Sequence, residues 1–216
     1  MSRLKVGVLI SGRGSNLHAL IDACAAPDYP AEIALVVSNR PDAPGLEHAN
    51  RAQIPALALD WKREFDSRAA YEEAVDRHLR EAGVELVCLA GYMLLLGEDF
   101  VRRWEGRVIN IHPSLLPLFK GLRPHQQALA SGMRVSGCTV HYVVPEMDSG
   151  PIIGQRAVPV LPGDDAETLG ARILEAEHRL YPECVRMIAE GRVRMEDGRA
   201  VFERTATASP ADGAGP

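Results

Sequence analysis

The sequence of 216 residues contains no apolar run long enough to cross a membrane. A transmembrane helix needs about 18 or more consecutive apolar residues, and every apolar run here is much shorter. The first residues, Met1 to Val6, lead directly into a strand-like segment and have no signal-peptide pattern. These absences predict a cytoplasmic protein that binds no membrane.

An excess of basic residues is also missing. The chain carries 24 Lys and Arg residues against 29 Asp and Glu residues, which gives a formal net charge of -5. Binding to a nucleic-acid backbone requires a broad basic surface, so we expect no nucleic-acid partner. A small local phosphate site is compatible with this charge.

The cysteines and histidines form no recognisable ligand set. Cys24, Cys88, Cys138 and Cys184 lie far apart in the sequence, and no two of them are spaced as C-x-x-C. No histidines are spaced like zinc ligands. We therefore expect reduced thiols and no metal site.

The first half of the sequence alternates apolar strands with amphipathic helices. The expected strands are residues 4–10, 33–37, 56–59, 85–90 and 107–112. The expected helices are residues 16–25, 42–52, 68–82 and 100–104, the third of them capped by Ser67. This pattern predicts parallel βαβ units in a sheet that is covered on both faces.

The pattern changes after about residue 130. Residues 138–144 and 152–160 are expected to form an antiparallel addition to the sheet, followed by a long helix from Asp164 or Asp165. We predict a single α/β domain at residues 1–190, with a mostly parallel, doubly wound, Rossmann-like sheet. A C-terminal extension at 191–204 and a disordered tail of small and polar residues at 205–216 would follow it.

The first chemical signal is a glycine-rich turn between the first strand and the first helix, Ser11–Leu17. Glycines let the backbone approach a ligand, and a helix N-terminus offers free N–H groups to an anion. The turn predicts a phosphate site at Gly14, Ser15 and Asn16. The missing Gly-Lys-Ser/Thr excludes a nucleoside-triphosphatase loop, and Leu17 in place of a third glycine disfavours a dinucleotide site. A tight turn without a ligand stays open.

The second signal is the pair Asn110 and His112, which share one face at the end of a predicted strand. An amide and a protonated imidazole can together stabilise a developing oxyanion. Asp148 follows in a loop fixed by prolines and a glycine, from which a carboxylate could orient a histidine and stabilise its charged form. The sequence alone does not bring Asp148 beside His112, so an ordinary turn aspartate is the alternative. His141 lies in a strand near this proposed site.

Residues 11–17, 89–93, 110–117 and 141–151 together resemble the folate-dependent formyltransferase family. The similarity covers about residues 4–190. The Asn-x-His pair with an aspartate is common to that family, whereas the Ser-Gly-x-Gly-Ser-Asn turn is similar to its glycinamide ribonucleotide branch. The resemblance implies a Rossmann-like formyltransferase fold. It also implies transfer of the formyl group of 10-formyltetrahydrofolate to the amine of glycinamide ribonucleotide, in de novo purine biosynthesis.

The same resemblance implies a role for each matched residue. Residues 14–16 would hold the phosphate, and Glu177 would bind the glycyl amine of the substrate. Asn110 and His112 would stabilise the oxyanion, with His112 giving a proton. Asp148 would keep His112 protonated and help to move protons through water.

The folate site is implied in the same way. The pterin would lie against the backbone of four residues, Met93, Leu94, Leu95 and Leu96. Asn110 would also contact the folate. The family often has Arg where this chain has Leu94, and Arg68 matches a position near the glutamate tail of the folate.

The expected ligands are therefore two small molecules, glycinamide ribonucleotide and 10-formyltetrahydrofolate as co-substrate, without a metal. A formyltransferase with the same three catalytic residues could instead act on another small amine or a sugar nucleotide. A nucleotide-binding module without catalysis would account for the glycine turn alone. Leu17 disfavours a nicotinamide-dependent dehydrogenase.

Overall fold

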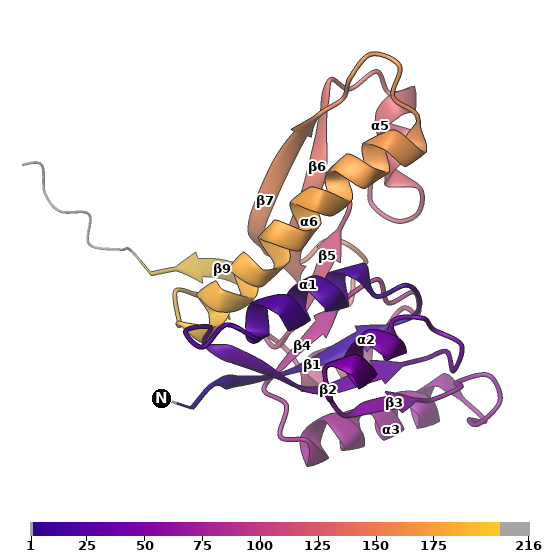
Figure 1. Ribbon diagram of the computed structural model, residues 1–216, viewed down its shortest axis with the longest axis vertical. Helices are drawn as coiled ribbons and strands as arrows, with labels where there is room; N and C mark the ends of the chain where they lie inside the picture. Colours follow the sequence, from indigo (N-terminus) through magenta and orange to yellow (C-terminus); the bar gives the residue numbers. More distant parts are fainter. Residues whose placement is uncertain (1, 204–216) are drawn as a thin grey trace, which may run out of the picture.

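Seven strands form one sheet in the order β3-β2-β1-β4-β5-β6-β7 in the computed structural model, which describes residues 2–203 (Figure 1). The first five strands are parallel and the last two are antiparallel additions. The strands are β1 Leu4–Ile10, β2 Ala31–Ser38, β3 Ala56–Ala58, β4 Leu86–Leu89, β5 Val108–His112, β6 Val135–Tyr142 and β7 Ile152–Pro159. This confirms the predicted α/β domain with a mostly parallel sheet and a late antiparallel addition.

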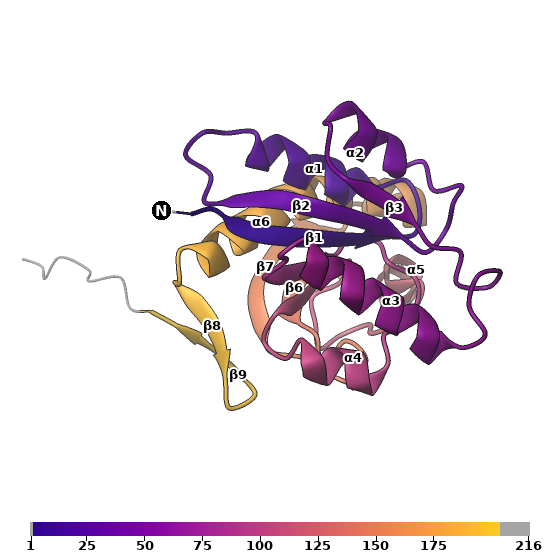
Figure 2. The ribbon, with the colours of Figure 1, turned by 90° about the horizontal axis from the view of Figure 1, so that it is seen from below.

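Helices cover both faces of the parallel strands, as Figure 2 shows, with α1, α2 and α6 on one side and α3 and α4 on the other. The helices are α1 Ser15–Cys24, α2 Leu46–Arg51, α3 Arg68–Glu81, α4 Glu98–Arg103, α5 Pro124–Ala130 and α6 Ala166–Ala189. Alternate residues of β1 point to opposite cores, because strand side chains have a period of two. Val8 packs into the core under α1 and α6, and Leu9 packs into the core under α3 and α4.

The sequence also predicts two helix starts correctly. Ser67 caps α3 by accepting a hydrogen bond from the backbone N–H of Ala70. Asp165 caps α6 and forms a reciprocal capping box with Thr168, which satisfies donors that the first helical turn leaves free.

Three expectations need correction or addition. The helix expected at 42–52 begins only at Leu46, because Pro44 disfavours helical backbone in the residue before it. The helix α5, Pro124–Ala130, spans only seven residues and is not among the helices expected above from their periodicity. The extension at 191–204 contains a hairpin of β8 Val193–Glu196 and β9 Arg199–Phe202.

The predicted disordered tail at 205–216 lies outside the described residues. Among residues 2–203, no helix combines the length and apolar character that a membrane span requires.

Tyr181 joins α6 to the sheet directly below its carboxyl edge. Its side chain is fully buried, and its hydroxyl lies 3.0 Å from the carbonyl oxygen of Leu89 and 3.3 Å from that of Ile109. A hydroxyl has one proton to donate, so the carbonyl of Leu89 at the end of β4 and the carbonyl of Ile109 within β5 share it. The longest helix is thereby held against the two central strands.

Replacing Tyr181 with Phe should lower the free energy of unfolding by about 1 kcal/mol, the usual net contribution of a buried hydrogen bond. Urea unfolding followed by circular dichroism measures the change. Tyr142→Phe is the matched control, because that buried hydroxyl lies 3.5 Å from its acceptor, the carbonyl of Val193. An equal or smaller loss in Tyr181→Phe than in the control would contradict this role.

Candidate active site

The strand order places the predicted motifs in one row. The turn Ser11–Asn16 follows β1, the segment from Gly91 follows β4, and Asn110 and His112 end β5, and these three strands are neighbours in the sheet. The chain moves from β1 to β2 and β3 on one side and returns to β4 on the other. In open α/β sheets, ligands bind at the crevice that such a reversal creates.

The glycine turn has the backbone of an anion cradle. Gly14 adopts a left-handed conformation, with φ of 72°, and immediately precedes α1. A Cβ atom on Gly14 would lie 2.7 Å from the Cα atom of Gly45, so only glycine fits. Ser15 begins the helix, and its first-turn N–H groups face the carboxyl edge of the sheet with the positive end of the helix dipole.

A cavity of about 380 Å³ lies between this turn and the segment after β4. Its lining residues are Ser11, Gly12, Arg13, Gly14, Ser15, Asn16, Arg40, Ala90, Gly91 and Met93. Two arginines of this set, Arg13 and Arg40, are functional candidates to which the sequence motifs assign no role. Arg40 follows β2, at the place where dinucleotide-binding folds carry an acid. A basic residue at that position is the sequence signal that could have identified Arg40 as a ligand-binding candidate. Its guanidinium pairs with Asp42 at 2.7 Å.

Glu177 meets the glycine turn from α6. Its carboxylate accepts a hydrogen bond of 2.7 Å from Asn16 Nδ2, and both side chains are buried. Burial raises the pKa of Glu177 to about 7, against the opposing effect of the Asn16 hydrogen bond, because desolvation disfavours the charged carboxylate. Within the described part of the chain, Asn16 Oδ1 is buried without a hydrogen-bond partner. This oxygen is therefore free to accept a hydrogen bond from a ligand.

His112 and Asp148 lie together, although 35 residues separate them in the sequence. Asp148 Oδ2 lies 3.4 Å from His112 Nδ1, and both side chains are about nine-tenths buried. His112 Nε2 lies 3.0 Å from the carbonyl oxygen of Phe119. Both ring nitrogens thus face acceptors, an arrangement that suits the doubly protonated imidazolium.

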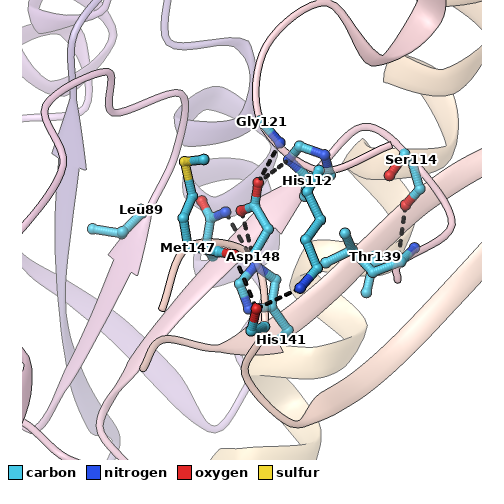
Figure 3. A network of polar contacts seen from close by, with 12 residues as sticks. Leu89, His112, Ser114, Gly121, Thr139, His141, Met147 and Asp148 are labelled. Carbon is cyan, nitrogen blue, oxygen red and sulfur yellow. Dashed lines mark hydrogen bonds and ion pairs between the residues drawn. The ribbon is translucent and has the colours of Figure 1, made fainter. Parts of the chain in front are cut away.

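The loop that carries Asp148 is held by a second loop, as Figure 3 shows. The backbone N–H of Gly121 donates to Asp148 Oδ2 at 2.8 Å, and Lys120 Nζ donates to Ser149 Oγ. Asp148 itself has left-handed backbone, with φ of 50°, which aspartate tolerates better than most residues. These contacts hold the Asp148 carboxylate beside His112.

His141 completes the cluster from β6, opposite Asn110 in the antiparallel register. Its Nε2 lies 3.3 Å from Asn110 Nδ2 and 3.8 Å from Asp148 Oδ1. Asn110, His112 and Asp148 are thus within one set of contacts. Within residues 2–203, no three His, Cys, Asp or Glu side chains are grouped as ligands for a metal ion.

Backbone hydrogen bonds hold the segment Met93–Leu96 at its two ends, and two of its side chains are exposed. The N–H of Met93 donates to Ser11 Oγ at 2.8 Å, and the N–H of Gly97 donates to Glu72 Oε1 at 2.7 Å. The side chains of Met93 and Leu95 are 75% and 56% exposed, which leaves an apolar surface open to a flat ligand.

Three further predicted folate residues differ in their surroundings. Leu96 is buried in the core under α3 and α4, so only its backbone is available to a ligand, while Leu94 is partly buried. Arg68 Nε donates to the same Glu72 oxygen, Oε1, at 3.0 Å. Glu72 therefore holds Arg68 beside the pinned segment.

Comparisons with known proteins identify the family of this chain. Residues 4–185 match the family model described as "Formyl transferase". The chain is 43% identical over 199 residues to "Phosphoribosylglycinamide formyltransferase" of Haemophilus influenzae, a match that covers 92% of this chain and 93% of that protein. The crystal structure of "glycinamide ribonucleotide transformylase 1" from Symbiobacterium toebii superposes with a TM-score of 0.89 at 49% identity, over 93% of this chain and 94% of that one.

A longer relative contains a similar segment. The chain is 52% identical over 194 residues to the "Trifunctional purine biosynthetic protein adenosine-3" of Gallus gallus. This match covers 90% of the chain but 19% of that protein, so the chain spans about a fifth of the length of this relative.

The buried Glu177 predicts a pH-dependent stability. Its pKa rises from 4.5 to about 7 on folding, so between these values the folded state holds a proton that the unfolded chain releases. Stability then falls as pH rises through this window. Glu177→Gln removes the titration, so relative to wild type the variant should gain about 1–3 kcal/mol of unfolding free energy between pH 5 and pH 8. Urea unfolding at both pH values tests this, and an unchanged difference between the two proteins would rule it out.

Proposed function

The chain belongs to the formyl transferase family, and on that premise we propose that it transfers the formyl group of 10-formyltetrahydrofolate to the amine of glycinamide ribonucleotide. This is a step of de novo purine biosynthesis and would draw on one-carbon metabolism. One observation carries the proposal: four side chains contact one another at the same sheet edge as the glycine turn. They are Asn110, His141, His112 and Asp148. We place the reaction in the cytoplasm, as the sequence predicts.

The ribonucleotide would bind at the turn and at α6. Its phosphate would accept hydrogen bonds from the N–H groups of Gly14, Ser15 and Asn16, with the two arginines of the cavity adding positive charge. The buried Glu177 and the free Oδ1 of Asn16 would accept hydrogen bonds from the N–H or O–H groups of the same ligand. The turn thus suits an anion, and the pair of Asn16 and Glu177 suits hydrogen-bond donors of the ligand.

The folate would bind beside it, against the exposed segment Met93–Leu95 and the backbone of Leu96. The pterin ring has a flat apolar face and a polar edge, which suit exposed apolar side chains and free backbone groups. Arg68 lies at the far end of this segment through its contact with Glu72, where it would bind a carboxylate of the glutamate tail.

The reaction would proceed by direct attack of the amine nitrogen on the formyl carbon, whose oxygen then takes the electron pair. Asn110 and His112 would donate hydrogen bonds to this oxyanion, the type of stabilisation that lowers acyl-transfer barriers most. His112 Nε2 would exchange its contact with the Phe119 carbonyl for the one with the oxyanion. As the bond to the folate nitrogen breaks, that nitrogen would take a proton from His112. The attacking nitrogen would lose a proton to Asp148, and His112 is 3.4 Å away to recover it.

Mixing the enzyme with 10-formyltetrahydrofolate and glycinamide ribonucleotide should deformylate the folate and formylate the ribonucleotide in equal amounts. Absorbance follows the folate, and mass spectrometry identifies the second product. An amino sugar nucleotide provides the comparison amine. Faster formylation of the sugar nucleotide would replace the proposed acceptor, and no transfer to either amine would leave a binding module.

Asn110→Ala and His112→Ala should each lower kcat by roughly 100-fold or more, the scale for losing an oxyanion donor or a general acid. The KM for each substrate should change much less, because the glycine turn and the segment Met93–Leu96 stay in place. Steady-state kinetics with circular dichroism as a check of folding measures both quantities. Turnover near the wild-type value in either variant would show that this cluster is not the reacting centre.

A further inference from the structure

The orientation of the Asn110 amide depends on a chain of hydrogen bonds that begins at a backbone carbonyl. His141 Nδ1 lies 2.8 Å from the carbonyl oxygen of Tyr142. A carbonyl oxygen can only accept, so Nδ1 carries the hydrogen. In a neutral imidazole Nε2 is then an acceptor, and the group of Asn110 that faces it at 3.3 Å must be the donor, Nδ2.

The first bond of this chain is shielded from competition. His141 is 2% exposed, and Gly150 packs against the same carbonyl, where a Cβ atom would lie 1.7 Å from Tyr142 O. No side chain larger than hydrogen fits at Gly150. Tyr142 is itself 1% exposed, so its carbonyl is shielded from water that would compete with His141 Nδ1.

The surroundings of His141 favour its neutral form. Burial lowers the pKa of this histidine, because desolvation disfavours the charged ring. The positive charges of His112 and Lys120 act in the same direction, whereas the Tyr142 carbonyl and the Asp148 carboxylate oppose it. Asp148 Oδ1 is 3.8 Å from Nε2, beyond hydrogen-bond distance, so it does not hold a proton on that nitrogen.

We propose that His141 is a positioning residue that acts through Asn110. As the neutral tautomer with hydrogen on Nδ1, it accepts one N–H of the Asn110 amide and so fixes the second N–H toward the reacting oxygen. The inference rests on the proposed function, since it needs Asn110 to be the oxyanion donor. A hydrogen on Nε2 would reverse the amide, and an amide oxygen would then face the developing negative charge.

The tautomer can be read directly in the wild-type enzyme. Histidine labelled with ¹⁵N in the ring gives long-range ¹H–¹⁵N spectra in which the two nitrogens report their protonation, with His141 assigned through its backbone. From pH 6.5 to 8, Nδ1 should carry hydrogen and Nε2 should not. Hydrogen on Nε2 at pH 7.5 would overturn the proposal, whether or not the enzyme transfers formyl groups.

A double-mutant cycle tests whether His141 acts through Asn110. His141→Phe should lower kcat by roughly 10- to 100-fold, within the scale for an oxyanion donor, with KM little changed. In the Asn110→Ala background the same substitution should change kcat by less than about 3-fold, because the group it positions is gone. Equal losses in both backgrounds, or no loss in the first, would overturn the proposal.

Val140→Ala is the matched control for damage to the strand. Val140 is fully buried in the same strand and packs into the core of the opposite face. It should lose stability and keep its kcat within about 2-fold. If His141→Phe does not fold, His141→Gln replaces it in the cycle, and the tautomer spectrum decides on wild-type protein alone. A wild-type enzyme that transfers no formyl group would refute the proposed function without changing that spectrum.

Discussion

The antiparallel pairing of β6 with β5 is the constraint on which the site depends. A parallel sheet alone presents the ends of β1, β4 and β5 along one edge. Each strand end then contributes only the side chains of the loop that follows it. The antiparallel neighbour places His141 directly opposite Asn110 and Thr139 opposite His112. The chain then returns through the loop before β7, which carries Asp148 back to the same edge. Side chains from two strand directions therefore meet in one small volume.

The same residue type has two environments within this volume. The His112 ring faces a carboxylate and a backbone carbonyl, both acceptors, which suits a charged ring that gives up a proton. The His141 ring faces a carbonyl on one side and an amide on the other, which suits a neutral ring that fixes a direction. Asp148 lies between them, closer to His112 than to His141. The two histidines therefore differ in role because their hydrogen-bond partners differ: His112 faces two acceptors, whereas His141 faces one acceptor and one donor.

Much of the fold could be predicted from the sequence because the central strands are short, apolar and separated by amphipathic helices. Asn110 and His112 could be placed on one face because strand side chains have a fixed period. The position of Asp148 could not be predicted, because it depends on an antiparallel register and on contacts from the loop around Gly121. Glu177 lies 161 residues from its partner Asn16, and no local pattern reports such a contact. The predicted start of α2 lies four residues before the observed one at Leu46, because the helical periodicity continues through a segment in which prolines and a glycine determine the backbone conformation.

The contact between Gly14 and Gly45 has a consequence for reading genetic variation in this protein. Gly45 contributes nothing to the cavity lining, yet a Cβ atom there would lie 2.8 Å from Ile10 Cδ1, 2.9 Å from Gly12 O and 3.0 Å from Gly14 Cα. Any side chain at this position would push the phosphate-type turn out of shape. In a screen for loss of growth without supplied purines, variants at Gly45 would group with those at residues that touch the ligand. Positions at which substitution abolishes growth would then include Gly45, which supports the turn, as well as the residues that line the pocket.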